Sequence, residues 1–246
     1  MPHKQFGLVG RNISYSFSKN YFTEQFQKNN TQDCTYENFD IQDINEFSKI
    51  IQNNPDLIGL NVTIPYKETV IPFLTKLSDN ALKIGAVNVI KITKEGEIIG
   101  DNSDYYGFKK ALEPLLQPHH TQALILGTGG ASKAVAFALE QLGIAYTFVS
   151  RKISENTINY SQLNAENFKK YQIVINTTPL GTSPNTEVFP EIPYQYFNSK
   201  YIAFDLIYNP SETQFLKKAK EHGAVIKNGQ EMLIFQAEKA WEIWNY

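Results

Sequence analysis

Residues 123–133 read Ala-Leu-Ile-Leu-Gly-Thr-Gly-Gly-Ala-Ser-Lys. Four apolar residues in succession predict a buried strand, and the glycines that follow predict a tight turn. Apolar residues with helical spacing occupy 134–142, and a second strand is expected at 146–149. Strand, glycine turn, helix and strand form a βαβ unit of the kind that binds dinucleotides. The stretch therefore predicts an α/β domain of the Rossmann type with a mostly parallel sheet.

The glycines of this turn are explained if the turn binds the pyrophosphate of a dinucleotide. Gly127 would permit the tight turn, and Gly129 would let the backbone approach the phosphates. A helix starting near Ala131 would direct its unpaired N–H groups and positive dipole end toward them. The candidate cofactor-binding residues of the turn are Gly127, Thr128, Gly129, Gly130 and Ala131. Glycine turns also occur as plain connectors, and the surrounding βαβ pattern is what favours binding here.

Cofactor choice is normally set at the end of the second strand, where an acidic side chain binds the ribose hydroxyls of NAD. Here the residues are Ser150, Arg151 and Lys152. Arg151 can fork onto a 2′-phosphate while Lys152 adds positive charge, so NADP is expected rather than NAD. The alternative is that Arg151 and Lys152 are simply solvent-exposed charges at the end of a strand. The negative charge of Glu155, close by in the sequence, would weaken the binding of a phosphate.

The rest of the chain continues the alternation of strands and helices. Further strands are expected at 6–9, 57–64, 86–92, 97–99, 173–176 and 202–206, and helices at 21–26, 69–83, 105–116, 212–221 and 232–244. Ser18 is the possible cap of the first helix, and residues 94–96 mark a hairpin turn. We expect an N-terminal αβ domain over 1–103, a dinucleotide-binding domain over 104–228, and a C-terminal helix over 229–246 that returns to the first domain.

Composition narrows the class of protein. A chain of 246 residues is long enough for one large domain or two modest ones, each with its own hydrophobic core. Its net charge of -2 gives no sign of a surface that binds polyanions. No apolar run approaches the roughly 20 residues of a membrane span, and the N-terminus lacks a signal-peptide pattern. We therefore expect a cytoplasmic protein with neither a nucleic-acid nor a membrane partner. Its histidines show no metal-ligand spacing, so no metal is expected.

Two further segments carry groups that can exchange protons. Residues 61–67 read Asn-Val-Thr-Ile-Pro-Tyr-Lys and end at Lys67, and residues 100–104 read Gly-Asp-Asn-Ser-Asp and end at Asp104. A proton-handling pair and a dinucleotide turn in one chain are what a dehydrogenase needs.

Eight motifs in order carry a resemblance to a known family. They lie at 14–18, 61–67, 85–88, 100–104, 127–132, 176–181, 205–208 and 228–236. On these motifs the chain resembles, nearly from end to end, the shikimate dehydrogenases. These are NADP-dependent enzymes that reduce 3-dehydroshikimate to shikimate in chorismate and aromatic amino-acid biosynthesis. The resemblance implies that 1–103 is a substrate-binding catalytic domain and that the partner is this small molecule.

The resemblance also implies roles for single residues. Lys67 and Asp104 would be the catalytic pair, and the substrate would be bound by Ser16, Ser18, Thr63, Asn88, Tyr208 and Gln236. Thr177, Ile207 and Gly229 would join the cofactor site. Hydroxyl and amide side chains suit a ring with one carboxylate and three hydroxyls. Taken singly, a serine or threonine after a strand is more often a cap, and Asn88 could merely satisfy backbone groups.

The expected chemistry is hydride transfer to the C3 carbonyl together with proton delivery to the developing alkoxide. Lys67 would donate that proton and stabilise the negative charge. Asp104 would orient Lys67 and accept a hydrogen bond from a substrate hydroxyl, so the two act as a coupled pair.

Several positions depart from the family pattern, among them Ser150 and Lys152, which stand where the family commonly has asparagine and threonine. Lys19 stands where the family usually has proline, Glu155 where a second arginine follows, and Ile207 where methionine is frequent. Two alternatives stay open. One is a quinate/shikimate dehydrogenase of broader substrate and cofactor range, and the other is a non-catalytic Rossmann-type binding protein. The protein is expected to be a monomer or a homodimer.

Overall fold

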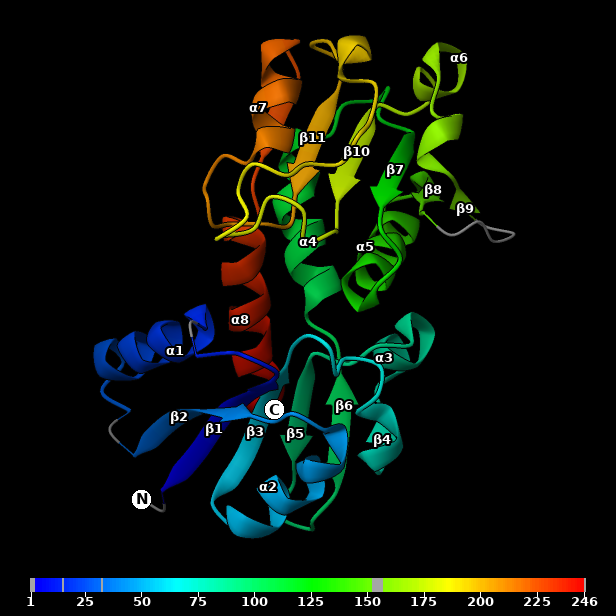
Figure 1. The fold of residues 1–246 in the computed structure, drawn as a ribbon. Coiled ribbons are helices and arrows are strands. Elements are labelled where there is room, and N and C mark those ends of the chain that lie inside the picture. Colours follow the sequence, from blue (N-terminus) through cyan, green and yellow to red (C-terminus); the bar gives the residue numbers. More distant parts are fainter. Residues whose placement is uncertain (1–2, 15, 32, 152–156, 246) are drawn as a thin grey trace. The chain divides into compact units, whose positions relative to one another are not determined.

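The computed structural model describes residues 3–14, 16–31, 33–151 and 157–245. The chain divides into two compact units, one formed by Met1–Ser103 with Ala237–Tyr246 and the other by Asp104–Gln236. Each unit is built on one six-stranded sheet (Figure 1).

The sheet of the first unit mixes parallel and antiparallel strands. Its order is β2-β1-β3-β5-β6-β4, with β1 at Lys4–Gly10, β2 at Cys34–Asp40, β3 at Leu57–Val62, β4 at Lys76–Leu77, β5 at Val89–Ile92 and β6 at Ile98–Asp101. β1 pairs in parallel with β2 and β3, while β5 pairs antiparallel with β3 and β6. The hairpin predicted around residues 94–96 is confirmed by β5 and β6, and Gly96 supplies the turn with a φ of 84°.

Helices cover both faces of this sheet. They are α1 (Phe17–Lys28), the 3₁₀ turns η1 (Ile44–Glu46) and η2 (Ile71–Phe73), α2 (Phe47–Asn53), α3 (Asp79–Ile84) and the end of α8 (Gln230–Asn245). Phe22 of α1 and Trp244 of α8 pack in one apolar cluster, and Phe47 of α2 and Ala81 of α3 pack in the other. The predicted cap of the first helix was wrong, because Ser16 and not Ser18 accepts the capping bond.

The single helix predicted over 69–83 was also wrong. The N–H groups of Thr75 and Ser78 donate to the carbonyls of Ile98 and Gly100, 2.9 Å away in each case, so this stretch joins the sheet as β4. Ser78 then caps a separate helix, α3, by accepting from the N–H of Ala81 at 3.1 Å. The helical pattern was interrupted by bonds to a strand more than twenty residues further along the chain.

The second unit has the predicted Rossmann-type architecture. All its strand pairs are parallel, in the order β12-β11-β10-β7-β8-β9. The strands are β7 (Gln122–Leu126), β8 (Ala145–Val149), β9 (Thr157–Ile158), β10 (Ile173–Asn176), β11 (Ile202–Asp205) and β12 (Val225–Lys227). The helical elements are α4 (Asp104–Leu112), η3 (Glu113–Leu115), α5 (Gly130–Gln141), η4 (Tyr160–Gln162), α6 (Ala165–Phe168), η5 (Tyr194–Tyr196) and α7 (Gln214–Glu221), with the start of α8.

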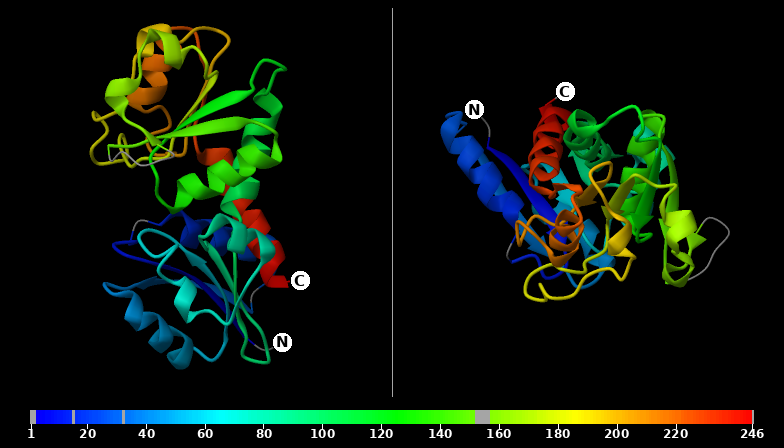
Figure 2. Two further views of the ribbon diagram at one scale, coloured as in Figure 1. Left: turned by 90° about the vertical axis from the view of Figure 1, so that its right-hand side faces the viewer. Right: turned by 90° about the horizontal axis from the view of Figure 1, so that it is seen from above.

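Alternate residues of these strands face opposite sides of the sheet. Ile125 packs with Val135 of α5 on one side, and Leu124 packs with Phe215 of α7 on the other. Figure 2 shows α5 and α7 on opposite faces of the sheet. Because both faces are covered, the strands read as continuous apolar runs.

The last turns of α8 complete the core of the first unit. The Trp244 ring lies 4.9 Å from that of Phe6 and 5.2 Å from that of Phe22, centroid to centroid, and its Nε1–H donates to the carbonyl of Ile90 at 3.0 Å. Gly59 leaves room for this ring, since a Cβ there would lie 2.6 Å from Trp244 Cδ1. Trp244 therefore joins the helix to the middle of the sheet.

Replacing this ring should destabilise the first unit. Trp244→Ala removes the aromatic packing and should lower the free energy of unfolding by about 3–5 kcal/mol. Trp244→Phe keeps most of the packing but removes the indole hydrogen bond to the Ile90 carbonyl, and should cost about 0.5–1.5 kcal/mol. Urea unfolding followed by circular dichroism measures both, with the exposed Asn245→Ala as the control. An alanine variant as stable as the control would contradict this role.

Candidate functional site

The glycine turn joins β7 to α5. Gly127 has a φ of 107°, and a Cβ there would lie 2.8 Å from Thr177 Oγ1, so the turn requires glycine at this position. Gly129 is extended, and a Cβ there would meet no atom of the described residues within 4 Å. The turn is therefore closed on the side of Thr177 and open above Gly129.

The first turn of α5 is suited to an anion. The helix begins at Gly130, one residue before the predicted start, and its N-cap Gly129 has no side chain to bond the first N–H groups. The N–H groups of Ser132 and Lys133 donate to the Gly129 carbonyl at 2.9 and 3.3 Å. Gly130 and Ala131 lie in the first turn, at the positive end of a helix of 12 residues. These features fit the pyrophosphate of a dinucleotide.

The end of β8 is held by the strand and turn that follow it. The N–H of Ser150 donates to the Ile158 carbonyl at 2.9 Å, and Asn159 Nδ2 donates to the Arg151 carbonyl at 3.2 Å. Burial raises the pKa of Tyr160, and the positive charge of Arg151 acts in the opposite direction. The exposed Arg151 side chain is thus next to a half-buried phenol. Lys152 and Glu155 lie outside the described residues.

Other candidate cofactor residues follow the ends of β10, β11 and β12. Thr177 donates to the Leu126 carbonyl from both its N–H (3.0 Å) and its hydroxyl (2.7 Å). The N–H of Gly229 donates to the Ile207 carbonyl at 3.0 Å, and a Cβ at Gly229 would overlap the Leu206 carbonyl. Because the strands are parallel, Gly127, Ser150, Thr177 and Ile207 lie at one edge of the sheet.

Three buried polar side chains at this edge were not among the predicted site residues. Asn176 and Asp205 are fully buried and Thr213 is 1% exposed. Burial raises the pKa of Asp205 to about 6, although hydrogen bonds from Thr213, Ile207 and Asn176 act in the opposite direction. Asn176 and Asp205 are the first residues of two motifs found in the sequence. A single polar residue at the end of a strand does not indicate which distant residues it will hydrogen-bond, so their interaction was not predicted.

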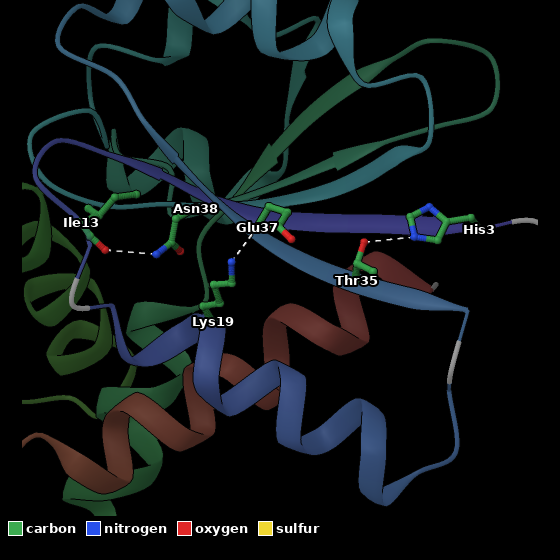
Figure 3. A network of polar contacts seen from close by, with 6 residues as sticks. All are labelled: His3, Ile13, Lys19, Thr35, Glu37 and Asn38. Carbon is green, nitrogen blue, oxygen red and sulfur yellow. Dashed lines mark hydrogen bonds and ion pairs between the residues drawn. The ribbon is translucent and has the colours of Figure 1, made fainter.

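The two candidate substrate-binding serines, Ser16 and Ser18, lie at the start of α1. Ser16 is its N-cap, and its Oγ accepts from the N–H of Ser18 at 3.1 Å, so the helix-cap interpretation is correct for Ser16. The Ser16 hydroxyl can still donate, because the cap uses an oxygen lone pair. Lys19 forms an ion pair with Glu37 of β2 at 2.7 Å (Figure 3).

Thr63, Lys67 and Asn88 lie close together in the first unit through backbone bonds. The N–H of Val62 donates to the Asn88 carbonyl at 2.9 Å, and the N–H of Val87 donates to the Lys67 carbonyl at 2.7 Å. The three residues thus lie between the carboxyl end of β3 and the start of β5.

The Asn88 side chain is 3% exposed and has a fixed orientation. Its Oδ1 accepts from the N–H of Ser103 at 2.6 Å, and its Nδ2 donates to Ser103 Oγ at 3.1 Å. Beside it, Tyr36 donates its hydroxyl to Asn61 Oδ1 at 2.8 Å, and Asn61 Nδ2 donates to the Asn88 carbonyl at 3.4 Å. Tyr36 and Asn61 were not predicted, because their contact joins residues 25 apart in the sequence.

The remaining candidates belong to the second unit. Asp104 is the first residue of α4 and is buried, and Tyr208 is half-buried after β11. Gln236 of α8 is 8% exposed, and its Nε2 donates to the Leu233 carbonyl at 2.9 Å. Lys67 belongs to the first unit and Asp104 to the second, so their pairing stays a prediction.

Within the described residues, no three histidine, cysteine, aspartate or glutamate side chains are grouped to hold a metal ion. None of the helices in those residues is both long and apolar enough to cross a membrane.

Known proteins resemble this chain over nearly its whole length. The family described as shikimate dehydrogenase substrate binding domain matches residues 8–90. A shikimate dehydrogenase (NADP(+)) from Clostridium botulinum is 36% identical over 249 residues, which cover 97% of this chain and 95% of the relative.

Two solved structures are similar as well. A shikimate dehydrogenase from Peptoclostridium difficile is 36% identical with a TM-score of 0.85, and the match covers 98% of this chain and 91% of that one. The enzyme from Thermus thermophilus, in complex with NADP(H) and shikimate, is 28% identical with a TM-score of 0.86 and coverage of 98% and 93%. The similarity therefore includes both units.

The two glycines of the turn should respond differently to the same substitution. Gly127→Ala forces a side chain into a positive φ and against Thr177, and should lower the free energy of unfolding by about 1–3 kcal/mol. Gly129→Ala should change it by less than about 0.5 kcal/mol, because its backbone is extended and the added methyl would contact no atom of the described residues. Thermal unfolding measures both.

Gly129→Ala should nonetheless weaken NADP binding about tenfold or more, because the methyl group fills the space through which phosphates approach the backbone. Fluorescence titration with NADPH measures the affinity. A Gly129→Ala variant that binds NADPH as tightly as the unchanged protein would show that the phosphates do not lie over this residue.

Proposed function

Since the chain belongs to the shikimate dehydrogenase family, we propose that it catalyses the reversible NADPH-dependent reduction of 3-dehydroshikimate to shikimate. The observation that carries this proposal is 36% identity over 97% of the chain to an NADP-dependent relative. The chain is accordingly an NADP-dependent oxidoreductase, and its place is in the shikimate pathway.

The cofactor residues are proposed from the turn and the sheet edge. Residues 127–131 bind the pyrophosphate, which the open space above Gly129 and the bare start of α5 support. Ser150, Arg151 and Lys152 take the 2′-phosphate, and Arg151 can do so with two parallel N–H donors. Thr177, Ile207 and Gly229 adjoin the nicotinamide. When bound, NADPH supplies the hydride that reduces the ring carbonyl of 3-dehydroshikimate.

The substrate residues are proposed from their chemistry and their fixed geometry. The hydroxyls of Ser16, Ser18 and Tyr208 donate to the substrate carboxylate, and Thr63, Asn88, Asp104 and Gln236 bind the ring hydroxyls. Asn88 supports this assignment best, because its two bonds to Ser103 hold the amide in one orientation before substrate arrives.

Lys67 is proposed as the proton donor. As the carbonyl carbon gains a hydride, the C=O π electrons move to oxygen, and the ammonium of Lys67 stabilises the resulting alkoxide. An N–H bond of Lys67 then breaks as the O–H bond of shikimate forms, and the neutral amine regains a proton from water. Asp104 orients the ammonium and accepts a hydrogen bond from a neighbouring substrate hydroxyl. In the oxidative direction each step runs in reverse.

The limits of the functional domains are proposed as 1–103 for substrate binding, 104–228 for NADP binding and 229–246 for the returning helix. A monomeric or homodimeric state and a cytoplasmic location remain predictions from the sequence.

A steady-state assay of NADPH formation tests the function directly. The protein should oxidise shikimate with NADP. Comparable rates with quinate and NAD would instead identify a dehydrogenase of broader range, and the absence of any shikimate-dependent signal would favour a non-catalytic binding protein.

Loss of the proton donor should affect turnover far more than binding. Lys67→Ala should lower kcat by about 10²- to 10⁴-fold while the KM for shikimate changes little. Lys83→Ala, at an exposed lysine in α3, is the matched control and should keep the kcat of the unchanged protein. Near-normal turnover in Lys67→Ala would refute the assignment.

Loss of the phosphate-binding guanidinium should affect NADP but not NAD. Arg151→Ala should raise the KM for NADP by about 10- to 100-fold, the effect of one lost charge-assisted hydrogen-bond pair, and leave the KM for NAD within a factor of about two. Steady-state kinetics with each cofactor measures both values. An equal change for NADP and NAD would mean that Arg151 does not bind the 2′-phosphate.

A further inference from the structure

A buried carboxylate lies where two loops of the proposed cofactor site meet. Asp205 is the last residue of β11 and is fully buried. Its Oδ1 accepts from Asn176 Nδ2 at 3.1 Å and from the N–H of Ile207 at 3.0 Å. Its Oδ2 accepts from the hydroxyl of Thr213 at 2.6 Å. One side chain thus bonds the end of β10, the loop after β11 and the start of α7.

The Asp205 carboxylate is linked by hydrogen bonds, through the Asn176 side chain, to the loop that contains Thr177. Asn176 Nδ2 donates also to the Leu180 carbonyl at 3.3 Å, and its Oδ1 accepts from the N–H and the hydroxyl of Thr178 at 3.0 and 2.6 Å. Since Asp205 holds the Asn176 amide, it fixes which end of that amide faces Thr178.

Through Thr213 the carboxylate closes the loop that carries Ile207 and Tyr208. Thr213 is the N-cap of α7, and its Oγ1 accepts from the N–H of Leu216 at 3.4 Å while its hydroxyl hydrogen points to Asp205. The loop is therefore anchored at Ile207, near its start, and at Thr213, at its end.

Stability alone does not explain a carboxylate here. Burial raises the pKa of Asp205 to about 6, and the hydrogen bonds from Thr213, Ile207 and Asn176 offset this effect only in part. Burying an unpaired carboxylate costs free energy, even when it is hydrogen-bonded. What the ionised group offers is acceptor capacity on both oxygens, which lets it receive three donors from three segments at once.

We propose that Asp205 is a positioning residue for the nicotinamide end of the cofactor site. Its carboxylate holds the 176–180 loop and the 205–213 loop in one fixed arrangement, so that Thr177, Ile207 and Tyr208 keep their places. This inference rests on the proposed function, because the roles of those three residues are part of it.

Two variants and a matched control test this role. Asp205→Asn keeps the shape but replaces one acceptor by a donor, and Thr213→Val removes the hydroxyl while keeping the branched side chain. Thr213→Ser keeps the hydroxyl and serves as the control. The first two should raise the KM for NADP about tenfold, comparable to the loss of one buried hydrogen bond, and the third should leave it within about twofold.

A cofactor fragment separates positioning from general damage to the unit. Adenosine 2′,5′-bisphosphate carries the 2′-phosphate but no nicotinamide, so its affinity should change by less than about twofold in the first two variants, whereas the affinity for NADP falls about tenfold. Isothermal titration calorimetry measures both ligands. Equal weakening of fragment and NADP, or unchanged NADP constants with only a lower melting temperature, would overturn the proposal.

The outcomes also separate this inference from the proposed function. If the unchanged protein fails to oxidise shikimate with NADP, the proposed function is wrong and the positioning role loses its basis. If the unchanged protein is active and the Asp205→Asn and Thr213→Val variants match it, only the positioning role is wrong.

Discussion

The parallel pairing of β7 with both β8 and β10 is the constraint on which the cofactor half of the site depends. The register places Leu126 level with Val149 and with Asn176, and Asn176 level with Asp205. Four strands therefore end in a row, and the residue after each end emerges at the same edge. The glycine turn, the basic strand end and both loops held by Asp205 are consequences of this alignment.

Much of this half could be predicted from the sequence. Fully buried parallel strands read as short apolar runs, so β7, β10 and β11 were each found, and three glycines identified the turn between β7 and α5. The edge strand β2 was missed, because polar residues such as Glu37 and Asn38 interrupt its apolar pattern. The helix α2 was not predicted, although Phe47 and Ile50 have helical spacing and pack in one apolar cluster.

What the sequence could not reveal depends on contacts between distant residues. The 69–83 stretch has helical spacing, yet the N–H groups of Thr75 and Ser78 bond the β6 strand and interrupt the helix. Asp205 receives its side-chain donors from residues 29 and 8 positions away, and Tyr36 reaches Asn61 across 25. Local patterns identify which residue types are present at a site, while long-range hydrogen bonds decide how each side chain is oriented.

The closing helix also bears on the order in which the chain can fold as it is synthesised. The second unit is one continuous stretch, Asp104–Gln236, whereas the core of the first contains both Phe6 and Trp244. Synthesis proceeds from the N-terminus at about 5–20 residues per second, so the first unit must wait for Trp244, which follows the whole second unit, before its aromatic core can close. The unit that is translated first is therefore the one that finishes last, and until then the surface that later receives Trp244 stays exposed to chaperones and to other nascent chains.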